Sequence, residues 1–256
     1  MPRFSANVSM LFTELPLLER FQAAAEAGFS AVEIQFPYEE KAHDLKEAAD
    51  QAGVETVLIN VPADDLLEGG KGLAGIPGRE TAYQEALELC VSYAEVLRPH
   101  CINVLAGREE NPDRYRDCHR TFVTNLRHTA ETFDRMGVTT VFEAVNTYDM
   151  PGFLVHNLRE QIEILEEVQH PHVMLQYDIY HMTRMGEHVC ENIFKYGHII
   201  GHIQFADVPG RGEPGTGEID FDAVFKAIDD SSYNGWIGAE YQPTNTTAST
   251  LGWLNI

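Results

Sequence analysis

The chain has 256 residues, 44% hydrophobic and 23% charged, which is the ordinary balance of a globular protein with a large core. No apolar run approaches the roughly 18 residues that cross a bilayer, so we expect no membrane partner. The formal net charge of −22 repels phosphate backbones without any Lys/Arg-rich stretch to offset it, so we expect no nucleic-acid partner. The same field opposes an anionic substrate unless arginines gather around it.

Length and N-terminal composition set two further expectations. A chain of this size fits one eight-fold βα barrel, so we expect a single domain over residues 1–256. The first residues lack the cationic start and apolar stretch of an export signal, which makes a cytoplasmic location the default. The four cysteines are widely spaced and contain no CxxC pair, so we interpret them as reduced thiols that pack like small apolar groups.

Eight short β-like runs alternate with segments of helical spacing, the pattern of βα units around a parallel sheet. The predicted strands are residues 4–10, 31–36, 55–60, 101–105, 139–143, 173–178, 199–204 and 235–241. Several are apolar without alternation, as strands covered on both faces should be. Eight units, and no phosphate-binding glycine motif after the first strand, favour a closed (β/α)8 TIM barrel over an open doubly wound sheet.

The connections carry the turn and loop signals of such a barrel. Helical spacing is clear in segments 17–25, 86–93 and 162–168, and Gly28, Gly53 and Gly137 are placed as glycine is just past a helix end. Two loops, residues 61–78 and 205–219, are longer than usual connections. Both follow the carboxyl ends of strands, where a barrel places its active site.

Four successive strands end, or nearly end, on an oxygen-bearing side chain: Glu143, Asp178, Gln204 and Glu240. A carboxylate in an apolar strand costs several kcal/mol if left unpaired, and neighbouring strands lie under about 5 Å apart, so these groups can converge. Together they predict a site for Mg²⁺ or Mn²⁺. Taken singly, each acidic residue is equally well explained by helix capping or an ion pair, and Gln204 by ordinary hydrogen bonding.

Four further residues are predicted to contact a substrate. His181 follows Asp178 by three positions and is placed either to bind substrate or to orient a metal ligand, or it is a satisfied core histidine. Arg211 lies on the long seventh loop, while Arg79 and Arg108 follow the third and fourth strands. Each arginine alone is most simply a surface charge, but together they are the groups available to hold a substrate anion.

With these residues placed, the sequence resembles the hydroxypyruvate isomerase family, in the xylose-isomerase-like barrel superfamily. The resemblance runs nearly end to end, through PRFSANVSMLFTELPLLERF, GLAGIPGRE, INVLAGR, VFEAVN, LQYDIYH, GHIQFADVPGRGEPGTGEIDF, GWIGAEYQP and LGW. It implies a reversible shift between hydroxypyruvate and tartronate semialdehyde, with Glu143 and Glu240 as metal ligands that also exchange protons and His181 near the substrate. Related epimerases carry a histidine where this chain has Gln204, which favours an isomerase.

Chemistry agrees with this resemblance, because moving a carbonyl to the next carbon requires proton removal and return through an enediolate. We assign Glu143 and Glu240 to proton transfer, and Asp178 and Gln204 to holding the metal. An isomerase of a longer 2-oxo sugar acid such as 2-oxo-tetronate, and a ketose 3-epimerase, remain alternatives. So do a non-catalytic sugar-binding barrel and, against the net charge, a multi-zinc nuclease. Association into a homo-oligomer stays open.

Overall fold

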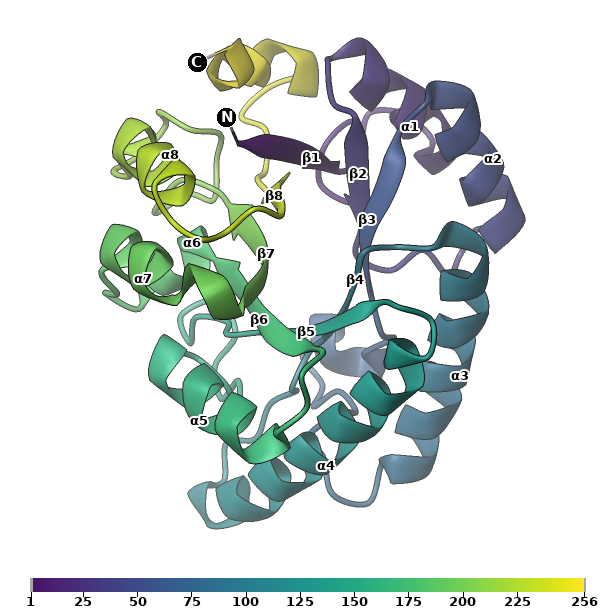
Figure 1. The fold of residues 1–256 in the computed structure, drawn as a ribbon, viewed down its shortest axis with the longest axis vertical. Helices are drawn as coiled ribbons and strands as arrows, with labels where there is room; N and C mark the ends of the chain where they lie inside the picture. Colours follow the sequence, from purple (N-terminus) through teal and green to yellow (C-terminus); the bar gives the residue numbers. More distant parts are fainter. Residues whose placement is uncertain (1, 256) are drawn as a thin grey trace.

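The computed structural model describes residues 2–255, and its eight strands close into a parallel barrel ringed by helices (Figure 1). Each strand pairs in parallel with the next, and β1 pairs with β8. This confirms the predicted TIM barrel. The strands are β1 (Arg3–Asn7), β2 (Ala31–Ile34), β3 (Glu55–Asn60), β4 (Cys101–Val104), β5 (Thr139–Glu143), β6 (Val173–Asp178), β7 (Ile200–Phe205) and β8 (Trp236–Ala239).

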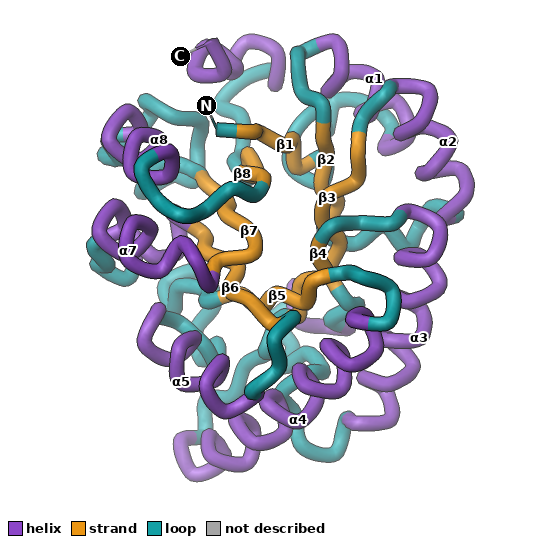
Figure 2. Tube along the Cα trace, in the orientation of Figure 1, coloured by secondary structure: helices purple, strands orange, loops and turns teal. Residues whose placement is uncertain are grey.

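The main helices lie outside the barrel, as the tube in Figure 2 makes plain. They are α1 (Leu17–Glu26), α2 (Ala42–Ala52), α3 (Glu80–Leu97), α4 (Tyr115–Asp134), α5 (Leu158–Val168), α6 (Ile179–Arg184), α7 (Val189–Tyr196) and α8 (Phe221–Asp229). Short 3-10 helices are η1 (Asp64–Glu68), η2 (Pro112–Arg114), η3 (Gly197–Ile199) and η4 (Thr247–Asn255). None of the described helices is long and apolar enough to cross a membrane.

The predicted strands 55–60, 139–143 and 173–178 match the observed bounds, while the other five differ at their ends. The first was predicted too long because Asn7 turns the chain: its side-chain oxygen accepts from the Ser9 backbone N–H at 3.0 Å, and its carbonyl accepts from Met10 at 3.0 Å. The eighth ends at Ala239, although the Glu240 N–H still donates to the Phe205 carbonyl at 3.0 Å. Glu240 therefore keeps its place at the rim of the barrel.

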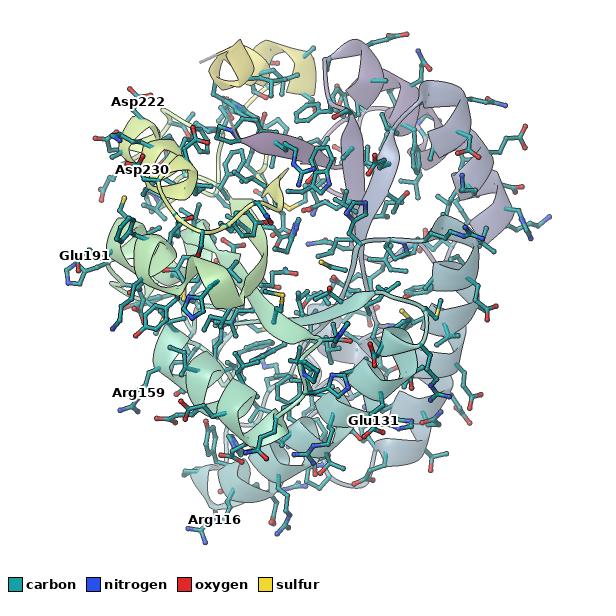
Figure 3. All side chains as sticks on the ribbon, viewed as in Figure 1. Arg116, Glu131, Arg159, Glu191, Asp222 and Asp230 are labelled. Atoms are coloured by element: carbon teal, nitrogen blue, oxygen red, sulfur yellow. The ribbon has the colours of Figure 1, made fainter. Side chains whose placement is uncertain are left out.

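Helix boundaries and faces follow the sequence pattern. Gly53 directly follows α2, and Gly137 lies in the turn after α4; they adopt φ of 72° and 71°, a conformation that glycine adopts without strain. Along α4, the residues Cys118, Phe122, Leu126 and Phe133 fall on one buried face. Figure 3 shows charged side chains such as Arg159 projecting away from the barrel. Most buried apolar side chains form one cluster of strand and helix residues. A smaller second cluster consists of strand residues alone: Ala31, Val57, Leu58, Cys101, Val141 and Trp236.

The C-terminal segment η4 lies beside the N-terminal strand (Figure 1). The Trp253 ring meets the Phe4 and Phe205 rings edge to face, with centroids 5.1 and 5.0 Å away. Thr247 of the same segment accepts a hydrogen bond from the Phe12 N–H at 2.6 Å. The end of the chain thus fixes the loop after β1 against the barrel.

Candidate active site

The four predicted ligand residues all lie at the carboxyl end of the barrel. Glu143, Asp178 and Gln204 belong to the last residues of β5, β6 and β7, and Glu240 directly follows β8. Their exposed fractions are 5%, 1%, 1% and 3%, so all four are buried. Asp178 pairs in register with Gln204, so these two stand at one height on neighbouring strands. All four side chains are therefore buried at the same end of the barrel, on or directly after strands β5 to β8.

Three groups come closest together: Glu143, Asp178 and His181 each offer one ligand atom within 4.8 Å of the others. The Nε2 atom of His181 lies 3.6 Å from Glu143 Oε1 and 3.7 Å from Asp178 Oδ2. This cluster could hold a metal ion. Asp178 also caps α6, because its Oδ1 accepts from the His181 backbone N–H at 3.1 Å. Asp178 thus caps α6 with Oδ1, as the sequence allowed, while its Oδ2 faces His181 Nε2.

The Glu240 carboxylate accepts four side-chain hydrogen bonds. Its Oε1 accepts from Asn7 at 2.8 Å, Gln35 at 2.7 Å and Gln204 at 3.1 Å. Its Oε2 accepts from Arg211 Nη2 at 2.6 Å. These contacts fix the carboxylate in place and leave it paired with the one arginine that the seventh loop delivers.

Arg211 reaches the site because the loop after β7 is tightly folded. Asp207, at 1% exposure, accepts from the backbone N–H groups of Gly215, Gly217 and Ile219 at 3.0, 2.8 and 3.0 Å. Arg211 itself has φ of 56°, and its guanidinium lies 5.2 Å from the ring centroid of Tyr180. The sequence placed Arg211 on a long loop, and the fold of that loop turns it inward.

Burial dominates the electrostatics of the site. It raises the pKa of Glu143 well above its ordinary value, and the neighbouring charges of Glu240 and Asp178 raise it further. Burial also raises the pKa of Glu240 to about 8, against the opposing pull of Arg211. The pKa of His181 falls to about 4, chiefly because burial disfavours the imidazolium. Three acidic groups that repel one another in a buried space are the donor set that a hard divalent cation fits.

The structure adds a buried group that the sequence reasoning missed. Glu33 on β2 is fully buried, and it accepts from Gln204 Nε2 at 2.7 Å and Asn7 Nδ2 at 3.0 Å, with His202 Nε2 at 2.6 Å. A carboxylate inside the apolar run AVEIQF carried the same signal as the strand-end acids. It was passed over because it does not end its predicted strand.

Gln204 is held by two neighbours inside the barrel. Its Oε1 accepts from Gln176 Nε2 at 2.5 Å, while its Nε2 donates to both Glu33 and Glu240. Gln176 also donates to Glu143 Oε2 at 3.1 Å. The two amides therefore bridge Glu143 and Glu240, and the Gln204 oxygen that a cation would use already has one donor.

The other two predicted arginines have partners outside the cluster. Arg79 pairs with Asp64 and, at 3.8 Å, with Asp65. Arg108 Nη2 lies 3.4 Å from Glu110 Oε1. Among the described residues, neither arginine forms a hydrogen bond or ion pair with Glu143, Asp178 or Glu240. The structure thus brings Arg211 and His181 to the site and leaves Arg79 and Arg108 on the loops after β3 and β4.

Buried acidic groups at the carboxyl ends of the strands place this barrel among enzymes that work from that face. Residues 21–256 match the family model described as xylose isomerase-like TIM barrel. The chain is 40% identical to "Hydroxypyruvate isomerase" of Escherichia coli K12, over 100% of this chain and 99% of the relative. It is 39% identical to "2-oxo-tetronate isomerase" of Cupriavidus necator, over 99% of this chain and 98% of the relative.

Among solved structures, a protein named "AP endonuclease, family 2" from Brucella melitensis superimposes with a TM-score of 0.96 at 36% identity, covering 100% of this chain and 98% of that one. The chain belongs to the xylose isomerase-like TIM barrel family, and within it to the hydroxypyruvate isomerase family that the sequence motifs indicated. It is an isomerase.

Proposed function

We propose that this protein, as one barrel domain, interconverts hydroxypyruvate and tartronate semialdehyde through an enediolate. The observation that carries the proposal is the set of buried acidic groups Glu143, Asp178 and Glu240 facing one end of the barrel, in a chain 40% identical to a hydroxypyruvate isomerase. Such groups suit a reaction in which one proton leaves one carbon and returns to its neighbour.

Glu143, Asp178, Gln204 and Glu240 would hold the metal, for which Mg²⁺ or Mn²⁺ fits a donor set made of oxygens. When bound, the ion supplies positive charge that stabilises the charge developing on the substrate oxygens. The fit rests on the crowding of buried carboxylates: burial first, and then the charges of Glu240 and Asp178, raise the pKa of Glu143. For Gln204 to contribute its oxygen, that atom must remain free on the side away from Gln176.

Glu143 and Glu240 are assigned to proton transfer. Burial raises the pKa of Glu240 to about 8, and burial followed by the charges of Glu240 and Asp178 raises that of Glu143. A carboxyl group whose pKa is raised toward the working pH is better matched to proton exchange with carbon. Moving the carbonyl requires a proton to leave one carbon for a carboxylate oxygen and a proton to reach the adjacent carbon from an acid. The hydroxyl proton must also pass from the oxygen of the first carbon to the oxygen of the second. Arg211 would bind the substrate carboxylate in place of its present hydrogen bond to Glu240. His181 would contact a substrate oxygen. Arg108 and Arg79 are the alternative residues for binding that carboxylate.

The test is turnover of hydroxypyruvate followed by proton NMR in deuterated water, with Mg²⁺ or Mn²⁺ and after removal of metal by a chelator. We expect tartronate semialdehyde to form, with deuterium at the carbon that receives the proton, and we expect the chelator to abolish the reaction. Parallel reactions with 2-oxo-tetronate and with ketoses separate the alternatives. A ketose epimerised faster than any oxo acid is isomerised would overturn the substrate assignment.

The longer acid is the second candidate, because the relative from Cupriavidus necator is 39% identical and bears the name 2-oxo-tetronate isomerase. The two acids share the reacting end and differ in what must fit beyond it. A higher kcat/KM for 2-oxo-tetronate would favour that candidate. DNA cleavage, which the name of the Brucella melitensis structure raises, is opposed by the net charge of −22. Epimerisation of a ketose without isomerisation of either acid would favour the epimerase. Absence of proton exchange with every candidate substrate would favour a non-catalytic binding protein.

A further inference from the structure

Asn146, three residues after Glu143 in the loop that follows β5, contacts the Nδ1 atom of the His181 ring. Both residues are buried, at 0% and 3% exposure. The Nδ2 atom of Asn146 lies 2.7 Å from His181 Nδ1, and the Asn146 backbone N–H points at the same atom from 3.4 Å. The opposite ring nitrogen, Nε2, faces Glu143 and Asp178. The imidazole therefore lies between Asn146 on one side and the carboxylates of Glu143 and Asp178 on the other.

The orientation of the Asn146 amide is determined by its own contacts. Its Oδ1 accepts from the backbone N–H groups of Tyr148 at 3.1 Å and Asp149 at 2.9 Å, so this atom must be the oxygen. The nitrogen is then on the other side, where its two protons have two acceptors: Asp149 Oδ2 at 2.9 Å and His181 Nδ1 at 2.7 Å. A reversed amide would place its nitrogen against two backbone donors.

We infer that Asn146 is a positioning residue that holds neutral His181 as the tautomer with its proton on Nε2. Two N–H groups point at Nδ1, so Nδ1 must present its lone pair, and the one proton of a neutral ring lies on Nε2. Tyr180 supports the arrangement by donating to Asp149 Oδ2 at 2.7 Å.

This tautomer decides what His181 can do in the cluster. A metal ligand must offer a lone pair, whereas Nε2 carries a proton and can only donate. His181 is thus excluded as a metal ligand although its Nε2 lies within the same 4.8 Å cluster as Glu143 and Asp178. On the proposed function, the Nε2–H group donates to the substrate oxygen that becomes negative in the enediolate, without charging the ring.

The experiment is nitrogen-15 NMR of the full chain with labelled histidine, with long-range proton correlations that distinguish a protonated from a bare ring nitrogen. The His181 signals are assigned by their loss in His181→Gln. In the wild type at pH 7 we expect Nδ1 bare and Nε2 protonated, both without metal and with Mg²⁺. A proton on Nδ1, a doubly protonated ring, or loss of the Nε2 proton with Mg²⁺ would overturn the inference.

Asn146→Asp supplies the second arm, because a carboxylate keeps the acceptor for the two backbone N–H groups but cannot donate to Nδ1. We expect the His181 proton to move from Nε2 to Nδ1. We also expect kcat to fall about 100-fold, because the substrate oxyanion loses one hydrogen-bond donor, and KM to change much less. The matched control is Asn157→Asp. Asn157 caps α5 by accepting from the Glu160 N–H at 3.0 Å, and an aspartate at this position caps the helix equally well.

The control should change neither the tautomer nor kcat. An unchanged tautomer in folded Asn146→Asp would refute the role of Asn146, and if that variant does not fold, the wild-type spectrum still decides the inference. The outcome is independent of the substrate, since the spectrum is expected even if hydroxypyruvate is not turned over. Failure of the proposed function would appear instead as a wild type with the expected tautomer and no isomerisation.

Discussion

Replacing Glu240 by Gln tests the proton-transfer assignment at the best-defined carboxylate of the site. The amide is isosteric, so its oxygen can take the place of Oε1 and keep the hydrogen bonds from Asn7, Gln35 and Gln204. Its nitrogen then faces the Nη2 donor of Arg211, which lies 2.6 Å from Oε2 in the wild type. One charge-assisted hydrogen bond is therefore lost.

Above pH 8, where Glu240 is ionised, loss of that bond costs about 1.5–3 kcal/mol, offset in part because a buried charge next to Asp178 and Glu33 also disappears. We expect a net loss near 2 kcal/mol and a fall in unfolding midpoint of about 4–8 °C, at about 2–4 °C per kcal/mol for a chain of this size. Removing a general acid or base costs about 10²–10⁴-fold in rate. Turnover of hydroxypyruvate should fall by that factor while the protein stays folded.

The assay pairs kcat for hydroxypyruvate with the unfolding midpoint, and the control is Glu110→Gln, where Glu110 is largely exposed. The control should change neither quantity appreciably, because an exposed pair contributes little. Near wild-type turnover in folded Glu240→Gln would remove Glu240 from proton transfer. A large loss of midpoint with proportionate loss of activity would indicate a structural role only.

Three other perturbations have defined outcomes. Because burial raises the folded pKa of Glu240 to about 8, the folded chain retains a proton that the unfolded chain releases, so without metal its stability should fall from about pH 4.5 to 8. Mn²⁺ should therefore raise the unfolding midpoint more at pH 8 than at pH 6, and a midpoint indifferent to Mn²⁺ at both would contradict the metal site. Gly238→Ala places a Cβ 2.3 Å from Glu33 Oε2 and should cost about 1–3 kcal/mol in urea unfolding, whereas Gly252→Ala, with no atom within 4 Å of its Cβ, should be nearly neutral. An aromatic disulfide reagent should label only partly exposed Cys190 in the native protein and all four thiols after denaturation; rapid native labelling of more than one would contradict the burial of the others.

Much of the fold could be predicted from the sequence because local chemistry and barrel geometry agree. Apolar runs too uniform to alternate faces predicted strands covered on both sides, and β3, β5 and β6 have the predicted bounds. Strand ends were less predictable where a side chain ends the strand, as Asn7 does by accepting from the Ser9 N–H. The three strand-end acids and Gln204 could be predicted because a polar or acidic side chain at the end of an apolar run is costly to bury without a partner.

By itself the sequence determined the barrel, the acidic strand ends and the family, because periodicity, strand-end chemistry and motifs are properties of short segments. Only the tertiary structure decided which distant groups meet. It joined Glu33 of β2 to His202 and Gln204 of β7, turned Arg211 toward Glu240, and left Arg79 with Asp64. The physical reason is that closing the barrel brings β2 and β7 side chains into one buried space, where hydrogen-bond partners are chosen by distance and not by sequence separation.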